Sequence, residues 1–588
     1  MQNNNEQLNN KRHSLAHLLA SAVQEQFPDT QLGIGPVIDN GFYYDFKFTK
    51  PLTPEDLPKL EKRMKELAKS KLGFERDEKS FDDACEFYKD KNQPFKTELI
   101  NDLEKSGEAQ ETVSLYTTGE FIDLCRGGHV ENTSEIDPKS FTLDKLAGAY
   151  WRGDEKNPMM TRIYGLAFDT EEELKAYIAQ REEALKRDHK KLGPELDLFV
   201  FSDLVGAGLP LWTPKGTMVR NLLDDFVWEL RKEKGYQKVE IPHITKKDLY
   251  EKSGHWDKFK DELFRITTRE GHEFAMKPMN CPHHTQIFDR KRWSYRELPQ
   301  RYCNTTVCYR DEQSGELAGL SRVRAFAQDD AHVFTRISQA KEEFVKVWDI
   351  VEQFYKAFGF EIKVRLSTRN PENPDSYLGD PQNWDKAQEL LQEIAKERGV
   401  ETLDGLGEAA FYGPKLDFMA NDSLGRQWQV ATIQFDFNMP ERFDLFCINE
   451  QGEQERIVMV HAAIMGSIER FLSILIEHTA GSFPVWLSPL QAMIVPIAEA
   501  HNDFANSVLE KIVQAVPSAR VEVDSRSESM GKRIRETAKQ KTPYILVIGD
   551  KEMTSNSVAV RGRNDEDLGT ITIDDFIAKL SDEIQKRS

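Results

Sequence analysis

Apolar residues recur at helical spacing in several stretches of the chain. Residues 11–27 carry an apolar stripe made of Leu15, Leu18, Leu19 and Val23. His13 and His17, at positions i and i+4, share one face of the same predicted helix. The same periodicity predicts helices at 51–72, 170–191 and 208–235. Because 170–191 is highly charged, we interpret it as a solvated linker helix.

Other stretches alternate between apolar and polar residues, as strands do. Residues 33–46 predict two strands joined by a hairpin turn at Asn40-Gly41. A further strand, 237–242, follows the helix that ends near residue 235. Residues 308–334 predict a strand, a glycine-containing loop and a second strand. On that second strand Gln328, Asp330 and His332 share one face.

The pattern changes in the C-terminal part of the chain. Buried strands at 492–497, 519–523 and 543–548 are separated or followed by helices at 501–516, 529–540 and 573–586. Such alternation is typical of a small α/β domain with a largely parallel sheet.

Composition limits the choice of protein class. A length of 588 residues is too great for one hydrophobic core and predicts about three or four domains. The net charge of -20 means that any RNA contact must come from local basic patches. Six scattered cysteines do not form a disulfide framework and favour a reducing cytoplasm. The N-terminus lacks the apolar core of a signal peptide, and no apolar run is long enough to span a membrane, so we expect a cytoplasmic protein.

Arginines gather where the predicted hairpin of residues 308–334 turns. Arg310, Arg322 and Arg324 keep their charge in a protein, and their planar guanidinium groups match phosphates and carboxylates. Together with the polar face of the second strand, they suit a site for a nucleotide and a small polar substrate. The alternative is an amphipathic hairpin with a solvated, salt-bridged face.

Two more segments bear on this choice: 274–284 (FAMKPMNCPHH) and 460–478 (VHAAIMGSIERFLSILIEH). With residues 308–334 they resemble the catalytic core of class II aminoacyl-tRNA synthetases, and in particular the threonyl-tRNA synthetase family. The likeness extends over nearly the whole chain. It implies a multidomain protein of α+β and α/β parts, with an antiparallel class II catalytic core, an α+β editing domain and a C-terminal α/β anticodon-binding domain.

The resemblance also implies domain boundaries and an activity. The editing domain would span 1–165, the linker helix 166–192, the catalytic domain 193–485 and the anticodon-binding domain 486–588. The implied enzyme activates L-threonine with ATP, transfers it to tRNA(Thr), and hydrolyses mischarged Ser-tRNA(Thr) at a second site. A homodimer is implied by residues 208–244, which resemble the motif that forms the dimer interface in this family.

Residue roles follow from the same resemblance. The catalytic residues would be Arg310, Arg470, Lys415 and His255, of which His255 assists acyl transfer. The residues that bind ATP, accompanied by Mg²⁺, would be Arg310, Glu312, Arg322, Gln429, Gln434 and Arg470. The residues that bind threonine would be Gln328, Asp330, Tyr412 and Met279. No P-loop sequence is present, in agreement with a class II mode of holding phosphates.

Amino-acid selection raises the question of a metal. Threonine and valine are nearly isosteric, and an apolar pocket separates such a pair only about a hundredfold. A metal that coordinates the amino group and the hydroxyl together would exclude valine. The resemblance assigns one Zn²⁺ to Cys281, His332 and His461, with a position left open for substrate. The alternative for each residue taken alone is a separate buried side chain. His283 and His284, close by in sequence, are not assigned as ligands.

Serine also offers an amino group and a hydroxyl, so a second, hydrolytic site is expected near the N-terminus. Losing one methyl group costs only about 1–3 kcal/mol of binding. The editing residues implied by the resemblance are His13, His17, Cys125 and His129, supported by Lys96, Tyr44 and Asp123. Three histidines and a cysteine could equally form a closed zinc site. The resemblance favours metal-free editing.

The chain departs from the family pattern in three places. Bacterial members usually begin with a small β-rich domain. We expect this domain to be absent, because the first predicted helix of the editing domain already starts near residue 11. Gly128 stands where proline is common, which should loosen its loop. Glu552 and Arg561 match positions that read anticodon bases, whereas Ser527 and Lys541 stand where Asn and Arg are usual. Lysine lacks the bidentate fork of arginine, so base contacts at Lys541 should be weaker.

Two rival functions fit parts of the sequence. A synthetase-like RNA-binding or regulatory protein would have lost the phosphate-binding arginines, but Arg310, Arg322 and Arg470 are in place. A class II enzyme for proline or serine would not combine the Cys/His/His set with an N-terminal H-x-x-x-H domain. Both are therefore less favoured than the threonine-specific ligase.

Overall fold

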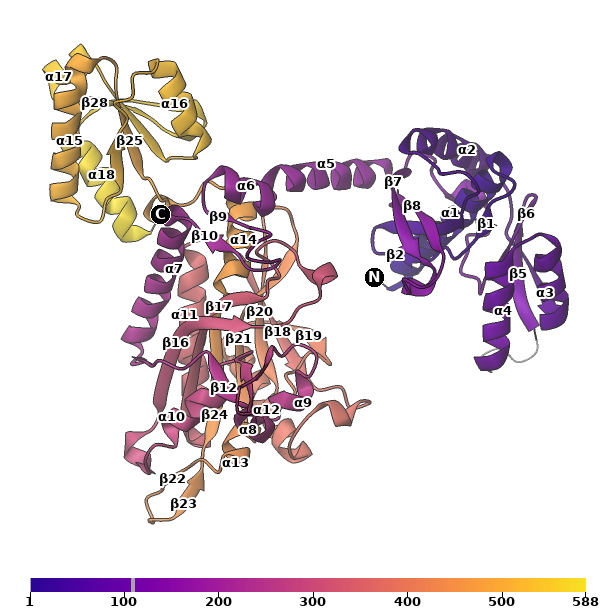
Figure 1. The fold of residues 1–588 in the computed structure, drawn as a ribbon, viewed down its shortest axis with the longest axis horizontal. Coiled ribbons are helices and arrows are strands. Elements are labelled where there is room, and N and C mark those ends of the chain that lie inside the picture. The colour runs from indigo at the N-terminus through magenta and orange to yellow at the C-terminus, as the bar shows by residue number, and fades with distance from the viewer. Residues whose placement is uncertain (1, 107–111, 588) are drawn as a thin grey trace. The chain divides into compact units, whose positions relative to one another are not determined.

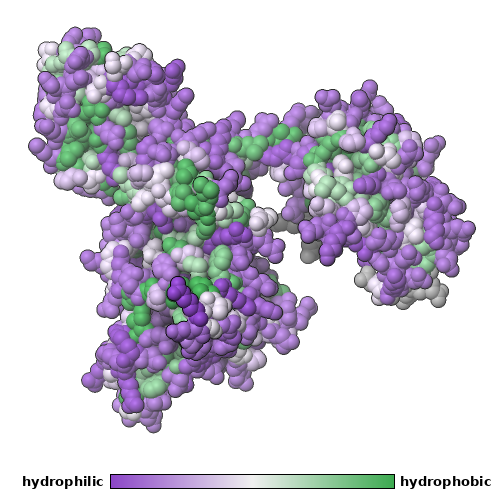
Figure 2. Space-filling model, in the orientation of Figure 1, coloured by the Kyte–Doolittle hydropathy of each residue, from purple (hydrophilic) through white to green (hydrophobic). Residues whose placement is uncertain are grey.

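The computed structural model describes residues 2–106 and 112–587, and the chain divides into two compact units, Met1–Glu182 and Glu183–Ser588 (Figure 1). Within the described residues, no helix is long and apolar enough to cross a membrane. Hydrophilic side chains cover most of the surface in view, interrupted by smaller apolar patches (Figure 2).

The first unit is built from helices packed on antiparallel sheets. Its elements are α1 (Gln2–Gln26), β1 (Gln31–Leu32), β2 (Val37–Ile38), β3 (Gly41–Lys47), α2 (Leu57–Lys69), β4 (Glu75–Ser80), α3 (Phe81–Asp90), α4 (Pro94–Ser106), β5 (Thr112–Thr118), β6 (Phe121–Leu124), β7 (Phe141–Tyr150) and β8 (Met159–Ala167). One sheet has the strand order β1-β3-β8-β7 with β2 beside β3, and a smaller sheet has the order β4-β5-β6. The predicted apolar stripe of α1 is fully buried, with Leu15, Leu18, Leu19 and Val23 at most 1% exposed.

The first predicted hairpin is present, but its turn differs from the prediction by one residue. Ile38 pairs directly with Gly41, so Asp39 and Asn40 form the turn and Gly41 begins β3. A Cβ on Gly41 would lie 1.9 Å from the carbonyl oxygen of Gly165. Glycine is therefore needed at this position for the close approach of β8 rather than for the turn.

The linker helix breaks near the start of the second unit. α5 covers Glu171–Arg187, and α6 (His189–Glu195) starts after Asp188, whose side chain accepts a hydrogen bond from the Lys190 amide at 2.8 Å. The prediction of one continuous helix over residues 170–191 is therefore wrong. Asp188 acts as an N-cap, and such a cap starts a new helix rather than continuing the old one.

A large sheet forms the centre of the second unit. Its strand order is β11-β16-β17-β24-β21-β20-β18-β19, antiparallel from β16 to β18 and parallel at both edges. The strands of this sheet are β11 (Gln237–Lys238), β16 (Gln300–Tyr309), β17 (Ala325–Thr335), β18 (Ile362–Thr368), β19 (Thr402–Leu406), β20 (Lys415–Asn421), β21 (Gln427–Asp436) and β24 (Val458–Ser467). The predicted strand 237–242 shortens to β11, and beyond it the Val239 amide still donates to the Cys303 carbonyl of β16 at 3.0 Å.

Helices α7 (Pro214–Glu233), α11 (Ile337–Lys356) and α14 (Ile468–Thr479) contribute to the main core beside this sheet. The remaining elements of the core region are β9 (Phe199–Val200), β10 (Leu211–Trp212), β12 (Ile244–Lys246), α8 (Lys247–Ser253), α9 (His255–Lys258), β13 (Arg265–Thr267), β14 (Glu273–Met276), α10 (Cys281–Phe288), β15 (Trp293–Ser294), α12 (Pro381–Glu397), α13 (Asn438–Arg442), β22 (Phe446–Ile448) and β23 (Gln454–Arg456).

The C-terminal domain, yellow in Figure 1, has a mixed five-stranded sheet of order β26-β25-β27-β28-β29. Its elements are β25 (Ala492–Pro496), α15 (Asn502–Ala515), β26 (Val521–Val523), α16 (Met530–Lys539), β27 (Tyr544–Ile548), α17 (Asp550–Ser555), β28 (Ser557–Arg561), β29 (Asp567–Thr572) and α18 (Ile573–Lys586). The first three strands of the order are parallel, as predicted. β28 and β29 add an antiparallel edge that the sequence pattern did not indicate.

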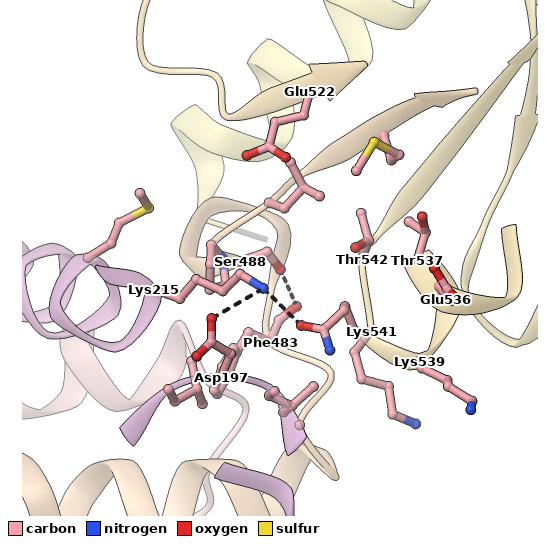
Figure 3. A pocket seen from close by; sticks show the side chains of 18 of the residues that line it. Asp197, Lys215, Phe483, Ser488, Glu522, Glu536, Thr537, Lys539, Lys541 and Thr542 are labelled. Carbon is pink, nitrogen blue, oxygen red and sulfur yellow. Dashed lines mark hydrogen bonds and ion pairs between the residues drawn. The ribbon is translucent and has the colours of Figure 1, made fainter. Parts of the chain in front are cut away.

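A cavity of about 650 Å³ lies beside the C-terminal domain (Figure 3). Lys215 lies between two partners there: its Nζ donates to Gln540 Oε1 at 2.9 Å and is 4.0 Å from an Asp197 carboxylate oxygen. Lys541 also lines the cavity, but none of the predicted metal, threonine or ATP residues does. This cavity is therefore separate from the predicted active site.

Candidate functional site

Three predicted metal ligands from distant parts of the sequence meet on the central sheet. Cys281 is the first residue of α10, His332 lies on β17, and His461 lies on β24 directly opposite His332. Their ligand atoms are all within 4.8 Å of one another, and each residue is buried. One sulfur and two imidazole nitrogens at this spacing could hold a metal ion, and this donor set is one that Zn²⁺ accepts with a position left open.

Neighbouring side chains hold the two imidazole rings in place. His461 Nε2 lies 2.8 Å from Asp436 Oδ2, and His332 Nδ1 lies 2.8 Å from His284 Nδ1. The Tyr412 ring stacks on His461 with ring centroids 4.8 Å apart. Partners of this kind orient the ligands of a metal. The sequence pattern had indicated neither Asp436 nor a role for His284, because both act through contacts between separate elements.

The electrostatics of this cluster suit metal ligation. Burial lowers the pKa of His332 well below its usual value, so its imidazole is neutral, as a ligand must be. Burial, reinforced by Asp330 and Asp436, raises the pKa of the Cys281 thiol well above its usual value. A bound cation would offset those two carboxylates and favour the thiolate. The residues present therefore fit a divalent metal.

The predicted threonine-binding residues lie around the same cluster. Asp330 Oδ2 accepts a hydrogen bond from the Asn280 amide at 3.1 Å, and Asn280 in turn accepts one from the buried Lys277 at 2.8 Å. Gln328 is two residues before Asp330 on β17, with a bulge relative to β24 between them. Met279 packs against the apolar cluster that contains Cys281. Lys277 and Asn280 were not predicted.

His255 lies close to the metal cluster. It is fully buried at the start of α9, its Nδ1 is 2.8 Å from Ser253 Oγ, and its Nε2 is 3.6 Å from Cys281 Sγ. Burial and the nearby His461 and Arg310 lower its pKa to about 3. His255 therefore lies close to both Arg310 and the metal cluster, so the residues predicted to bind phosphate and those predicted to bind threonine are near each other.

The three arginines predicted to bind phosphate differ in their partners. Among the described residues, neither Arg310 nor Arg470 forms an ion pair with a carboxylate. Arg322 pairs with Glu312 at 2.7 Å and with Glu316 at 3.1 Å. Partial burial and the charge of Arg322 lower the pKa of Arg470. Arg310 and Arg470 therefore keep positive charges that no carboxylate of the described residues offsets, which favours the binding of an anion.

Arg324 has a different role from the other arginines of the loop. Its guanidinium donates to the backbone carbonyl of Glu312 at 2.8 and 3.0 Å. It therefore fixes the loop between β16 and β17 instead of facing a ligand.

Lys415 and Gln429 are connected by a buried carboxylate, and Gln434 lies on the neighbouring strand opposite Lys415. Asp417, fully buried on β20, lies 2.9 Å from Lys415 Nζ and accepts hydrogen bonds from Gln429 at 2.9 Å and Arg365 at 3.0 Å. The Gln429 oxygen accepts from Arg365 at 3.2 Å, so both ends of this amide are engaged. Gln434 accepts a hydrogen bond from the Tyr412 hydroxyl. The sequence pattern did not single out Asp417 or Arg365.

A second histidine cluster lies in the first unit. Cys125 Sγ is 3.3 Å from His13 Nε2 and 3.3 Å from His129 Nε2, and the ligand atoms of His13, His17, Cys125 and His129 are all within 4.8 Å. Burial raises the pKa of Cys125 to about 11 and lowers that of His129 to about 2. The cluster therefore consists of neutral imidazoles and a thiol.

The supporting residues of this cluster form a buried chain. Asp123 lies 2.5 Å from Lys96 Nζ, accepts a hydrogen bond from the Tyr44 hydroxyl at 2.6 Å, and lies 3.9 Å from His17 Nε2. Lys96 and Asp123 are both only 2% exposed. The structure thus brings all seven predicted editing residues to one place.

Gly128 has a defined conformation in this site. Its φ is +83°, and its neighbour Gly127 has φ +105°. Proline, whose ring holds φ near about −65°, cannot adopt this conformation. The loop therefore follows a path that requires glycine.

The predicted anticodon-reading residues lie in the C-terminal domain. Glu552 accepts a hydrogen bond from the Gly549 amide at 3.0 Å and caps α17, Arg561 pairs with Asp565 at 2.9 Å, and Ser527 is exposed. Lys541 has φ +56°, and its carbonyl accepts from Arg563 at 2.9 Å.

Three family models match the chain. Residues 264–479 match the tRNA synthetase class II core domain (G, H, P, S and T), residues 491–583 match an anticodon binding domain, and residues 113–164 match the threonyl and alanyl tRNA synthetase second additional domain. A threonine–tRNA ligase from Cytophaga hutchinsonii is 47% identical over 579 residues, which are 98% of this chain and 88% of that protein. This chain belongs to the threonine–tRNA ligase family.

Two further comparisons agree with this threonine–tRNA ligase assignment. The threonine–tRNA ligase of Gloeobacter violaceus is 47% identical over 100% of this chain and 94% of its own length. The crystal structure of the RNA binding domain of threonyl-tRNA synthetase from Cryptosporidium parvum has a TM-score of 0.63 and 37% identity, covering 67% of this chain and 98% of that one. The predicted family, enzyme class and multidomain fold are confirmed, including a second domain associated with the editing of mischarged tRNA.

Proposed function

We propose that the core around Cys281, His332 and His461 activates L-threonine with ATP and transfers it to tRNA(Thr). The observation that carries this proposal is the position of His255. It lies 3.6 Å from Cys281 and stacks on the ring of Phe259, whose centroid is 5.6 Å from the guanidinium carbon of Arg310. The metal-ligand set and an arginine without a carboxylate partner among the described residues therefore lie close together, as the joining of threonine to a nucleotide requires.

Threonine is selected in this proposal by Zn²⁺ held by Cys281, His332 and His461. When bound, zinc would supply coordination for both the amino group and the hydroxyl, which valine cannot satisfy. Asp330 would accept the hydroxyl hydrogen bond, and Tyr412 and Gln328 would seat the amino-acid head, with Met279 packed beside them.

ATP is held by charge in this proposal. Arg310 would stabilise the α-phosphate as the threonine carboxylate attacks it, while Arg322 and Arg470 hold the outer phosphates with Mg²⁺. Lys415 would add a further cation, and Glu312, Gln429 and Gln434 would contact the nucleotide. His255 would assist transfer of the threonyl group to the tRNA ribose.

The first unit would hydrolyse Ser-tRNA(Thr) without a metal. The neutral imidazoles of His13, His17 and His129 and the Cys125 thiol would position the terminal adenosine and a water, and the Lys96–Asp123–Tyr44 chain would support them. The exposed faces of Cys125, His13 and His129 leave this site open to a substrate.

The remaining parts complete the proposed enzyme. The editing domain would span residues 1–165, the linker helix 166–192 and the catalytic domain 193–485. Residues 486–588 would bind the anticodon of the tRNA through Glu552, Arg561, Lys541 and Ser527. A homodimer is supported by exposed apolar side chains before and on α7: Val200, Phe201, Leu204, Val205, Leu211 and Met218. Six free cysteines support a cytoplasmic location.

Metal content tests the zinc assignment. We expect about one zinc per chain in the unaltered protein and in Cys125→Ala, and none in Cys281→Ala. Retention of zinc by Cys281→Ala, with loss in Cys125→Ala, would place the metal in the first unit and overturn the assignment.

ATP–pyrophosphate exchange tests the activation reaction. We expect strong exchange with threonine, weaker exchange with serine and none with valine, all lost in Cys281→Ala. Absence of exchange in the folded, zinc-loaded protein would contradict the proposed activity.

A further inference from the structure

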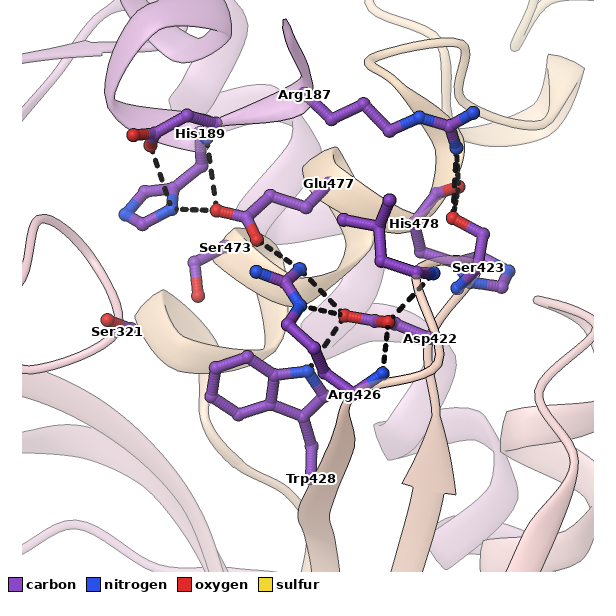
Figure 4. A network of polar contacts seen from close by, with 12 residues as sticks. Arg187, His189, Ser321, Asp422, Ser423, Arg426, Trp428, Ser473, Glu477 and His478 are labelled. Atoms are coloured by element: carbon purple, nitrogen blue, oxygen red, sulfur yellow. Dashed lines mark hydrogen bonds and ion pairs between the residues drawn. The ribbon is translucent and has the colours of Figure 1, made fainter. Parts of the chain in front are cut away.

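His189 lies outside every site described so far, yet it joins three segments of the second unit (Figure 4). It is the first residue of α6 and is only 4% exposed. Its Nδ1 is 2.6 Å from Glu477 Oε1 on α14, and its Nε2 is 3.0 Å from the backbone nitrogen of Leu320 in the loop between β16 and β17.

These contacts define the tautomer of His189. A backbone N–H can only donate, so Nε2 must accept from Leu320, and Nδ1 must carry the hydrogen that is donated to Glu477. Both ring nitrogens are therefore occupied. Although Asp188, His189 and Glu477 have the spacing of a metal cluster, His189 has no lone pair left for a metal.

The loop contact lies close to a predicted phosphate ligand. The Ala318 amide donates to the carbonyl of Arg322 at 3.1 Å, which closes a turn around Leu320. Leu320 is fully buried, and Gly319 has φ +57°, with the position of a Cβ only 2.3 Å from His189 Nε2. The tip of the turn therefore rests directly on the imidazole, two residues before Arg322.

The contact with Glu477 on α14 connects His189 to Arg470, the second arginine predicted to bind phosphate. The other oxygen of Glu477 pairs with Arg426. Arg426 and Arg470 both lie over the ring of Trp428, at 5.4 and 6.0 Å from its centroid. The Trp428 indole donates to Asp422 at 3.0 Å, and Asp422 also accepts from Arg426 at 2.7 Å. The Trp428 ring, which Arg470 covers, is thus connected to His189 through Arg426 and Glu477. Figure 4 shows these contacts for the labelled residues His189, Glu477, Arg426 and Trp428.

We propose that His189 is a positioning residue that sets the separation of Arg322 and Arg470 and so tunes the ATP site from the segment that follows the linker helix. This inference rests on the phosphate-binding roles proposed above for those two arginines. His189 does not reach the nucleotide itself. Its Nε2 accepts a hydrogen bond from Leu320 in the loop that carries Arg322. Its Nδ1 donates to Glu477 on α14, the helix that carries Arg470.

Two substitutions separate the two contacts. Asparagine places a polar nitrogen near the position of Nδ1, so His189→Asn keeps the donation to Glu477 and loses the acceptor for Leu320. Glutamine places an oxygen near the position of Nε2, so His189→Gln keeps the acceptor and loses the donor. Glu477 keeps Arg426 and the His189 backbone N–H as partners when the imidazole donor is lost, whereas the Leu320 N–H loses the acceptor that His189 supplies, so the loss of that acceptor is the costlier change. His189→Asn should therefore have the larger effect on ATP.

The test measures KM for ATP, KM for threonine and kcat in ATP–pyrophosphate exchange with the full chain. We expect His189→Asn to raise KM for ATP about 10-fold and to leave KM for threonine within about twofold, whereas His189→Gln raises KM for ATP about threefold or less. A purely structural role would lower the melting temperature and the active fraction without this selective change in KM. Arg187→Ala is the matched control, because Arg187 contacts Ser423 and the His478 carbonyl in the same network but not the loop.

Arg322→Ala and Arg470→Ala separate the two proposals. If both raise KM for ATP and His189→Asn does not, the positioning role is overturned and the arginine roles stand. If neither raises it, the phosphate-binding roles fail, and the positioning role fails with them. Should His189→Asn not fold, Gly319→Ala carries the same test, since its Cβ would displace the loop from His189.

Discussion

Asp436 is a single buried carboxylate that orients one ligand of the proposed metal centre. It is fully buried, and its Oδ2 lies 2.8 Å from His461 Nε2. Asp436→Asn removes the negative charge while keeping the size of the side chain. Because carboxylate partners raise the basicity of a ligating imidazole, we expect zinc affinity to fall about 10- to 100-fold, measured by competition with a chromogenic chelator. Asp444→Asn, on the exposed Arg456 pair, is the control. Equal affinities in both variants would contradict this role.

The histidines of the first unit predict a pH dependence of stability. Burial lowers the pKa of His129 to about 2 and also lowers those of His13 and His17. Below the ordinary histidine pKa of 6.5, the unfolded chain binds protons that the folded unit excludes. The free energy of unfolding of this unit should therefore fall as pH decreases from 6.5, by at most about 1.4 kcal/mol per pH unit for each histidine.

Hydrogen exchange of α1 in the full chain measures this effect. After correction for intrinsic exchange rates, protection should be lower at pH 5.5 than at pH 7.5, and His129→Asn should reduce the difference. Protection that rises on acidification would mean that the histidines are protonated beside Asp123, contrary to the structure.

At the scale of an element, α7 contains a glycine where helix propensity and packing oppose each other. A Cβ on Gly216 would lie 1.8 Å from the backbone oxygen of Leu198, which cannot move aside as a side chain can. Gly216→Ala gains about 1 kcal/mol of helix propensity but incurs about 1–3 kcal/mol or more of overpacking. We expect the melting temperature to fall.

Gly531→Ala is the matched control for that prediction. Gly531 lies in α16, and nothing lies within 4 Å of its Cβ position. Its substitution should leave the melting temperature unchanged or raise it. If Gly216→Ala were also stabilising, the close approach of α7 to Leu198 would be wrong.

At the scale of the whole molecule, Arg563 ties the C-terminal domain to the preceding chain. Its guanidinium donates to the Phe483 carbonyl at 2.6 Å, to Ser488 Oγ at 3.1 Å and to the Lys541 carbonyl at 2.9 Å. Burial lowers its pKa to about 10, so it remains charged at neutral pH. Arg563→Ala would remove these three partly buried hydrogen bonds.

The effect of Arg563→Ala should appear only in the reaction that includes tRNA. A tRNA must reach the anticodon domain and the catalytic core together, and a looser connection lowers the effective concentration of the second contact. We expect KM for tRNA in aminoacylation to rise about fivefold, while ATP–pyrophosphate exchange stays within about twofold. Lys579→Ala, in an exposed pair on α18, is the control. A matching loss in the exchange reaction would show that Arg563 supports the core instead.

Elements with strong periodicity and clear caps were predictable from the sequence. The helix predicted at 573–586 coincides with α18, whose Thr572 cap accepts from the Asp575 amide. β29 was not predictable, because it is mostly exposed and lacks an apolar alternation. The break at Asp188 was missed because the charged residues on both sides of it are equally good helix formers.

The proposed metal, phosphate and editing residues were predicted from the sequence, because their residue types lie in recognisable segments: Cys281, Arg310, His332, His461 and the H-x-x-x-H pair of α1. The tertiary structure alone decided which side chains support them. Asp436, Asp417 and His189 lie in stretches without a distinctive local pattern, and His284 lies in a distinctive segment that did not reveal its role. All four act through hydrogen bonds across strands and between helices and loops. Such contacts depend on the register of the sheet and on helix packing, which bring together residues that are far apart along the chain.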